Sequence, residues 1–389
     1  MKKDVYQIVD ICEIKSGKRL PKDTDFADHE TDYPYIRARD IKNGKICTES
    51  LVYLEKEVQE KIKRYVINSG DIAITIVGAS VGDVGYATPE VDGYNLTENA
   101  VRLTSFSENV NSKYLFYILY QKQYRDYMQL IAGAAAQPKL GIYKVQRIKV
   151  ELPNIETQNK IVDILSAYDE LIENNNKRIT ILEQMAENLY KEWFVRFRFP
   201  GYETTEFEDG IPYNWEKIGI SDVYDIKYGK TLSTSEIRTS GEFAVYGANG
   251  VIGYYDKFNC DNYVTLITSR GNGSGDVLRT HHKKSFITNN SFTVIPKGKY
   301  NYLKHEFTYW SMKNVNFKSV CSGAAQPQLT NNSINSLSII LPDSELINSF
   351  CNIVENYFAL IENLLEENEN LTKQRDLLLP RLMSGKLEV

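Results

Sequence analysis

The chain has 389 residues and a formal net charge of −5, with 42% hydrophobic and 25% charged residues. This length exceeds one ordinary domain, and the composition is that of a soluble globular protein. No apolar run has the length of a membrane span and the first residues do not form a signal peptide, so we expect a cytoplasmic protein. Five scattered cysteines without a CxxC pair support neither a disulfide framework nor a zinc site.

Residues 1–151 have the pattern of a first globular half. Short apolar runs between turn residues predict strands at 35–36, 71–77, 100–103 and 148–150. Tyrosine and aliphatic residues at helical spacing predict one helix over residues 112–130.

Two long helices are predicted, over residues 152–198 and 341–389, and they match at an offset of 189 positions. Tyr168 then falls on Tyr357. Asn154 and Asp343 share the offset and are good N-cap types. Pro380 is predicted to end the second helix, because its ring clashes with the preceding turn.

Apolar residues alternately four and three apart predict a coiled-coil seam, and helices of about 40 residues would be roughly 60 Å long. The seam residues are Ile161, Leu165, Tyr168, Ile172, Asn175 and Leu182 in the first helix, and Val354, Tyr357, Ile361, Leu364, Asn368 and Leu371 in the second. A lone buried asparagine leaves amide groups unsatisfied. We therefore expect Asn175 to pair with Asn368 and to set an antiparallel register.

A second globular half, residues 213–340, follows an acidic linker at 199–212. It repeats the first loosely. EIKSGK, ending at Lys18, matches DIKYGK, ending at Lys230, and TENA from Thr97 matches TNNS from Thr288. Residues 302–320 are the expected counterpart helix, and an Ala-Gln-Pro loop precedes each long helix, at 136–138 and 325–327. The predicted fold is mixed α/β (α+β), with a pseudo-two-fold internal repeat.

The search for catalytic motifs finds none that is complete. Gly229-Lys-Thr lacks the first glycine of a phosphate-binding P-loop, and Gly271-Asn-Gly-Ser-Gly275 lacks the spacing of a dinucleotide fingerprint and is interpreted as a turn. His281-His282 has no further ligand at metal spacing, so a surface strand is the better interpretation. No Asn-Pro-Pro-aromatic motif is present, so we do not expect base methylation.

Binding chemistry is what remains. The long helices carry the negative charge, whereas residues 220–340 sum to about +5. Basic and amide residues beside turns could contact phosphates or base edges. The candidate DNA-binding residues are Lys15, Lys18, Arg19, Arg37, Arg39 and Lys42 in the first half, and Lys227, Lys230, Ser269, Arg270, Asn272, Lys283 and Lys284 in the second.

The whole chain resembles the specificity subunit of type I restriction–modification systems. The resemblance is carried by LTKQRDLLLPRLMSGKL at 371–387, Leu-Pro-x4-Gln at 152–158, EWFV at 192–195, PYNW at 212–215 and the two Ala-Gln-Pro loops. In the second copy the glutamine of the Leu-Pro-x4-Gln motif is replaced, since Leu346-Ile-Asn stands where the first copy has Thr157-Gln-Asn.

The resemblance implies two target recognition domains, each reading one half of a split sequence in double-stranded DNA. It implies two long antiparallel helices that separate the halves and that two modification (methyltransferase) subunits bind, with restriction (endonuclease/translocase) subunits joining. S-adenosylmethionine, ATP and Mg²⁺ would then belong to the partner subunits, and this chain would be non-catalytic. The alternative left open by the residues is a coiled-coil adaptor between proteins that does not read DNA.

Overall fold

The computed structural model describes residues 2–133, 137–323 and 327–389. The chain divides into two compact units, residues 1–172 with 369–389, and residues 173–368. Of the two Ala-Gln-Pro loops, Ala136, Ala325 and Gln326 lie outside the described residues.

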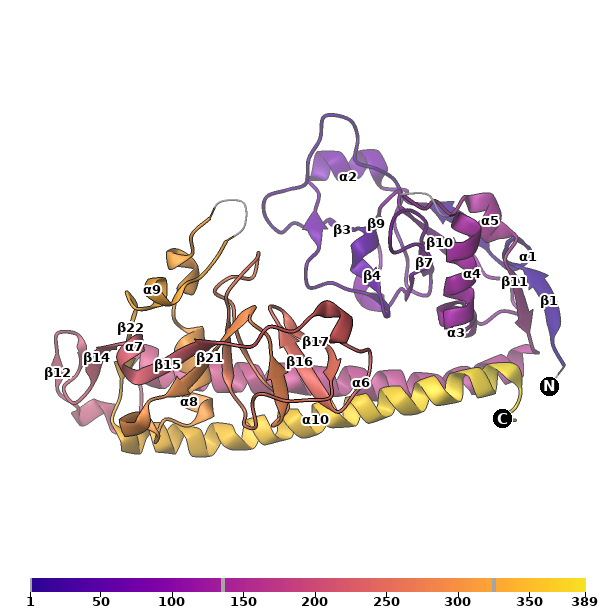
Figure 1. The fold of residues 1–389 in the computed structure, drawn as a ribbon. Coiled ribbons are helices and arrows are strands. Elements are labelled where there is room, and N and C mark those ends of the chain that lie inside the picture. Colours follow the sequence, from indigo (N-terminus) through magenta and orange to yellow (C-terminus); the bar gives the residue numbers. More distant parts are fainter. Residues whose placement is uncertain (1, 134–136, 324–326) are drawn as a thin grey trace. The chain divides into compact units, whose positions relative to one another are not determined.

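The first unit is built on a six-stranded sheet of order β2-β10-β7-β8-β5-β4, with a three-stranded sheet β6-β3-β9 and the pair β1-β11. Helix α3 packs against β8, and Figure 1 shows α3 and α4 following one another beside this sheet. The strands are β1 (Asp4–Gln7), β2 (Glu13–Ser16), β3 (Pro34–Ile36), β4 (Ile41–Lys42), β5 (Gly44–Ile46), β6 (Val52–Tyr53), β7 (Ile72–Thr75), β8 (Val84–Tyr86), β9 (Asn95–Leu96), β10 (Ala100–Thr104) and β11 (Lys149–Leu152). The helices are α1 (Ile8–Ile11), α2 (Lys56–Ile62), α3 (Ser112–Tyr120), α4 (Lys122–Ala132) and α5 (Ile142–Gln146).

The second unit has a four-stranded sheet β15-β21-β18-β19, a three-stranded sheet β17-β16-β20 and the pairs β14-β22 and β12-β13. Its strands are β12 (Phe207–Glu208), β13 (Ile211–Pro212), β14 (Glu216–Gly219), β15 (Tyr224–Tyr228), β16 (Phe243–Gly247), β17 (Gly250–Tyr255), β18 (Thr265–Thr268), β19 (Val277–Arg279), β20 (Ser285–Ile287), β21 (Ser291–Pro296) and β22 (Ser338–Leu341). Its own helices are α7 (Ile220–Val223), α8 (His305–Lys313) and α9 (Asn331–Ile334).

The two long helices are α6 (Ile155–Tyr190), which continues as a π turn over Lys191–Val195, and α10 (Ser344–Ser384). Each contributes one segment to each unit. The predicted caps are confirmed. The amide of Thr157 donates to Asn154 Oδ1 and the amide of Leu346 to Asp343 Oδ1, both at 2.8 Å.

The helices are antiparallel in both units. In the first, Arg375 pairs with Asp169 at 2.7 Å. In the second, the Tyr190 ring lies 5.9 Å from that of Phe350, and Asn175 Nδ2 donates to Asn368 Oδ1 at 3.1 Å. The expected asparagine pair is therefore confirmed.

The predicted seam residues are buried or half-buried throughout. Ile161, Leu165, Asn175, Val354, Ile361, Leu364 and Asn368 are buried, and Tyr168, Ile172, Leu182, Tyr357 and Leu371 are half-buried. Seam residues form part of each unit's own core, since Ile161 and Leu165 belong to the core of the first unit and Val354 and Ile361 to that of the second.

Two single helices predicted from the sequence are wrong. The one at 112–130 is broken at Gln121, which is extended, because α3 is enclosed over residues 114–119 whereas α4 buries only Met128 and lies at the surface. The one at 302–320 ends at Lys313. Asn314 Nδ2 bonds the Trp310 carbonyl and Asn316 caps the next short turn, so asparagine side chains replace the helical bonding.

The predicted end of the second helix at Pro380 is also wrong, because α10 continues to Ser384. Proline removes only one hydrogen bond this close to the end. Leu382 and Met383 beyond it are buried in the core of the first unit and hold the last turn in place. His281 and His282 lie in a bend between β19 and β20 and not in a surface strand.

Candidate nucleic-acid interface

Each unit carries a short glycine-bounded loop between two central strands. The first tip loop, residues 78–83, leads from β7 to β8, and the second tip loop, residues 271–276, leads from β18 to β19. Because these strand pairs are antiparallel and buried, each tip loop stands on a rigid base.

The two tip loops have the same backbone hydrogen bonds. In the first, the amides of Val81, Gly82 and Asp83 donate to the carbonyls of Gly78, Thr75 and Ser80 at 3.1, 3.0 and 3.0 Å. In the second, the amides of Ser274, Gly275 and Asp276 donate to the carbonyls of Gly271, Thr268 and Gly273 at 2.9, 2.8 and 2.8 Å. The sequence repeat therefore extends to matched loop conformations.

Glycines bound both tip loops for a conformational reason. Gly78 and Gly271 have φ of +94° and +88°, and Gly82 and Gly275 both have φ of +88°. Side chains are strained in this left-handed region. A Cβ at Gly82 would also lie 3.2 Å from the Arg125 carbonyl oxygen, so the loop ends close against α4.

A cation from the following helical segment holds the end of each tip loop. Arg125 of α4 lies 2.6 Å from Asp83, and Lys318 lies 2.7 Å from Asp276. Burial raises the pKa of Asp83, and Arg125 opposes that rise. The Asp276 carboxylate raises the pKa of Lys318.

A glycine–lysine turn lies beside each tip loop. A Cβ at Gly17 would lie 2.0 Å from the Thr97 carbonyl oxygen, and one at Gly229 would lie 2.3 Å from that of Thr288. Only glycine permits these contacts, so the two sequence motifs matched in each half meet at the same place. Lys18 and Lys230 follow directly and are exposed.

One further segment joins the glycine–lysine turn to the tip loop in each unit. The amide of Ile76 donates to the Asn99 carbonyl at 2.8 Å, and the amide of Ser269 to the Asn290 carbonyl at 2.9 Å. Asn99 and Asn290 lie two residues after the threonines that contact the glycines. Backbone contacts therefore connect the tip loop, the glycine–lysine turn and the segment between them in each unit.

The exposed side chains on this common frame differ. The first tip loop presents Ala79 and half-buried Ser80, whereas the second presents Asn272 and is directly preceded by exposed Arg270. Small neutral groups and an Arg/Asn pair offer different hydrogen bonds to a base edge. The two units are thus alike in backbone and distinct in chemistry.

Comparison with known proteins gives a family. The model of the type I restriction modification DNA specificity domain matches the chain twice, over residues 2–184 and 212–372. The chain belongs to this family.

Relatives of the DNA specificity family match over nearly the whole chain. The type I restriction enzyme MjaIX specificity subunit of Methanocaldococcus jannaschii is 28% identical, over 99% of this chain and 94% of its own length. The HindI specificity subunit of Haemophilus influenzae is 24% identical, over 91% of this chain and 94% of its own. The crystal structure of a type I S subunit from M. genitalium is 18% identical, covers 98% of this chain and 96% of its own, and has a TM-score of 0.56, which shows a shared fold.

In the first unit the structure places the family's candidate basic residues in two environments. Lys18, Arg19 and Arg39 are exposed, although Arg19 pairs with Glu98 at 2.9 Å. Lys42 is exposed in β4, and Lys15 is exposed in β2 and pairs with Glu13. Arg37 is different. Its Nε lies 3.0 Å from the buried carboxylate of Asp40, and its side chain is only 19% exposed, so it braces the loop.

In the second unit Lys230, Arg270, Asn272, Lys283 and Lys284 are exposed, and Lys227 pairs with Asp225 at 3.2 Å. Among the residues that the structure describes, Arg270 has no ion-pair partner. Ser269 is fully buried and its hydroxyl is directed to the Asn289 carbonyl, so it supports the base of the tip loop from the interior of the unit. Lys284 lies over the Phe258 ring at 5.1 Å.

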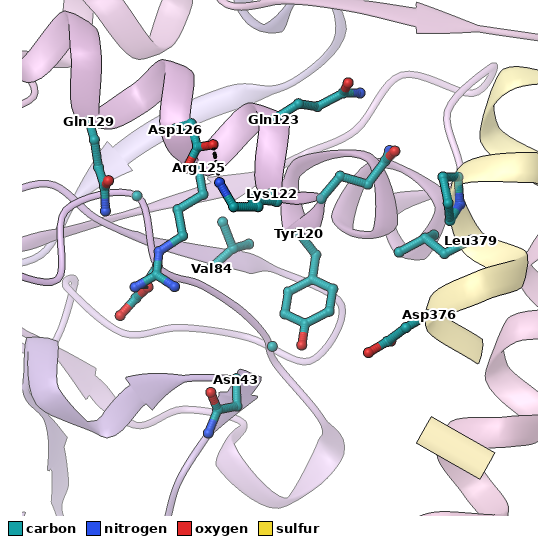
Figure 2. A pocket seen from close by; sticks show the side chains of 15 residues that line it. Asn43, Val84, Tyr120, Lys122, Gln123, Arg125, Asp126, Gln129, Asp376 and Leu379 are labelled. Atoms are coloured by element: carbon teal, nitrogen blue, oxygen red, sulfur yellow. Dashed lines mark hydrogen bonds and ion pairs between the residues drawn. The ribbon is translucent and has the colours of Figure 1, made fainter. Parts of the chain in front are cut away.

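Sequence reasoning missed the first tip loop and its anchor, Asp83 with Arg125. The available signal was the spacing Gly-x-x-x-Gly, present at both 78–82 and 271–275. The missed anchor borders a cavity of about 650 Å³. Figure 2 shows Lys122, Arg125 and Gln129 of α4 on one side of it and Asp376 and Leu379 of α10 on another.

No group of three metal-ligating side chains occurs within residues 2–133, 137–323 and 327–389. Over the same residues, no helix combines the length and the apolar character needed to cross a bilayer.

Proposed function

We propose that this specificity subunit reads a bipartite DNA sequence, with each unit contacting one half through its tip loop and glycine–lysine turn. The observation that supports this is the pair of identically bonded loop frames that carry different exposed side chains. A frame shared by both units suits the common shape of duplex DNA, and different tip residues suit different bases.

The chemistry of the second tip loop supports direct reading of bases. Arg270 can donate a fork of two hydrogen bonds to a guanine edge, and the Asn272 amide can both donate to and accept from adenine. Lys18 and Lys230 each stand next to a tip loop, where a point charge can neutralise a phosphate and orient the duplex. In this proposal Lys18 and Lys230 contact phosphates, whereas Arg270 and Asn272 contact bases.

We also propose that the long helices bind two copies of one partner, the modification subunit. Ile164 and Leu171 of α6 are 36% and 48% exposed, and their repeat counterparts Ile353 and Leu360 of α10 are 37% and 45% exposed. Residues seven apart lie on one helix face. Each unit therefore presents the same small apolar stripe, which suits two identical partners. Restriction subunits would join that assembly.

Chemistry in this proposal belongs to the partners. S-adenosylmethionine would bind the modification subunits, and ATP with Mg²⁺ the restriction subunits, while this chain positions them on DNA. The family match supports the division, because the model of a DNA specificity domain matches the chain twice, over residues 2–184 and 212–372.

The test is selection of duplexes from a random pool by the full chain in complex with its modification subunit. We expect enrichment of one split sequence with a spacer of constant length. Replacing residues 77–82 by the sequence of residues 270–275, which carries Arg270 and Asn272, should change the first half of that sequence and leave the second half unchanged. Enrichment of no sequence, with the complex intact, would identify an adaptor that does not read DNA.

The proposed docking stripes need a separate measurement. Leu171→Lys and Leu360→Lys together should abolish co-purification of the modification subunit, whereas either alone should leave one partner bound. Leu130→Lys, which changes a residue that is 77% exposed on α4, is the matched control. Full assembly by the double variant would place docking elsewhere.

A further inference from the structure

A pocket in the first unit combines cations with tyrosine rings, away from the tip loop. It has a volume of about 590 Å³ and is lined by Gln123, Tyr124, Tyr127, Arg147 and Lys149. Arg125, which anchors the tip loop, is not among these residues.

The local structure explains why these five side chains converge. Arg147 follows α5 and Lys149 begins β11, and both are exposed on either side of buried Ile148 and line the pocket. Gln123 and Tyr127 are four residues apart on α4, and Tyr124 is three before Tyr127, so they share one helix face. Tyr124 Oη donates to the Lys149 carbonyl at 3.3 Å, which joins the two elements.

The charge of this pocket is of one sign. Arg147 and Lys149 have no ion-pair partner among the described residues, and no carboxylate lines the pocket. The adjoining hollow shares Gln123 and Tyr124 and adds Lys3, Arg381 and Lys386, with Glu151 as its one lining carboxylate. Glu151 is 3.6 Å from Lys3. The two hollows together therefore hold an excess of positive charge suited to an extended anion.

The second unit provides an internal comparison, because it repeats strand β11 as β22 without this chemistry. The amide of Ile8 bonds the Ile148 carbonyl, and the amide of Ile220 bonds that of Leu337, so β22 corresponds to β11. Ser336 and Ser338 then stand where the first unit has Arg147 and Lys149. The fold does not require cations here, so they serve a purpose that belongs to the first unit alone.

We propose that this pocket binds backbone phosphates of duplex DNA outside the base pairs that the tip loops read. The inference rests on the proposed function, which brings a duplex to this unit. An arginine fork and a lysine point charge neutralise phosphates, and phenol and amide groups donate to their oxygens. Because only the first unit has this pocket, the protein contacts more DNA outside the first half-site than outside the second.

The test measures binding of the full chain to a duplex bearing the selected sequence, over a range of salt concentrations. Each neutralised phosphate contributes about 0.9 to the slope of log K against log salt. Arg147→Gln with Lys149→Gln should therefore reduce that slope by about 1.8, while relative affinities for mismatched duplexes stay unchanged. Arg147→Lys with Lys149→Arg should keep the wild-type slope.

The control is Lys160→Gln with Lys373→Gln, which removes two exposed positive charges from the helix segments of the same unit. Its slope should equal that of the wild type. Shortening the duplex beyond the first half-site should remove the difference between pocket variant and wild type. An unchanged slope in the pocket variant overturns the proposal. If that variant also loses binding of the modification subunit, the pocket contacts protein and not DNA. Failure of the wild type to discriminate sequences would instead refute the proposed function.

Discussion

Arg270 is the residue whose environment best separates base reading from ordinary surface charge. It is exposed beside the second tip loop and no carboxylate pairs with it among the described residues. Loss of one bidentate base contact costs roughly 1–3 kcal/mol. Arg270→Ala should therefore weaken binding of the selected duplex by that amount and relax one position of the second half-site, as measured by binding to singly mismatched duplexes.

Arg238 is the matched control for that experiment, because it is an exposed arginine of the same unit. Arg238→Ala should leave the base preference at that position of the second half-site unchanged. If Arg270→Ala preserves both affinity and preference, Arg270 is only a surface charge and the bases are read by other residues.

His305 makes a different prediction, because the residue is half-buried and both of its ring nitrogens are buried without a hydrogen-bond partner in the described part of the chain. Burial, and then the positive charge of Arg279, lowers its pKa to about 3 from an ordinary value of 6.5. The unfolded chain therefore binds a proton that the folded chain excludes. The stability that this neutral imidazole contributes is complete above pH 6.5 and is lost as pH falls toward 3.

Each pH unit in that window costs roughly 1.4 kcal/mol. The free energy of unfolding, measured with urea, should fall between pH 7 and pH 5. This fall should be smaller by about 2 kcal/mol in His305→Phe than in the wild type. His29 is the contrast, since the Asp28 carboxylate raises its pKa and gives the opposite sign. An equal acid loss in wild type and His305→Phe would mean that the imidazole is protonated in the folded state.

At the scale of elements, the polar layer in the helix seam fixes the register. Asn175 Nδ2 donates to Asn368 Oδ1 and to Glu367 Oε2, at 3.1 and 3.0 Å, and Asn368 Nδ2 donates to Asn176 Oδ1 at 2.9 Å. Asn175→Leu alone leaves Asn368 Oδ1 without the amide that donates to it, and should cost about 1–3 kcal/mol in urea unfolding.

The double change Asn175→Leu with Asn368→Leu should recover that loss, because an apolar pair leaves no unsatisfied group. It should also permit other registers, seen as a broader range of accepted DNA spacers. A double variant with a single unchanged spacer would show that the globular cores set the register.

Helix length makes a further prediction. Four residues inserted after Arg178 add about 6 Å to α6, and DNA rises about 3.4 Å per base pair. Sequence selection with the variant should recover the same half-sites with a spacer longer by one or two base pairs. A spacer of unchanged length would show that the length of the helices does not determine the spacing of the half-sites.

At the scale of the whole molecule, the family match and the internal repeat predict that this chain recognises the DNA sequence and that a partner chain catalyses methyl transfer. The purified chain should transfer no methyl group to DNA from S-adenosylmethionine, and should support transfer once the modification subunit is added. Incorporation of labelled methyl groups measures this directly. Methylation by the isolated chain would contradict the assignment, provided that the preparation contains no modification subunit.

Much of this architecture could be predicted from the sequence, because the long helices signal themselves by periodicity and by a repeat. The asparagine pair followed from one rule about unsatisfied amides. The breaks at Gln121 and after Lys313 could not be predicted, because enclosure in a core and local asparagine bonds decide them. Arg37 resembled a DNA contact until Asp40 was seen to hold it, since ion pairing across a turn has no sequence period.

The division of α10 between the units has a consequence for synthesis. The second unit is one continuous stretch, residues 173–368, whereas the first needs residues 369–389 to supply buried Leu379, Leu382 and Met383. Domains fold as units while the chain is being made. The half that is translated first is therefore completed last, once residues 369–389 have left the ribosome. Premature termination after residue 368 would leave a finished second unit attached to a first unit with an open core.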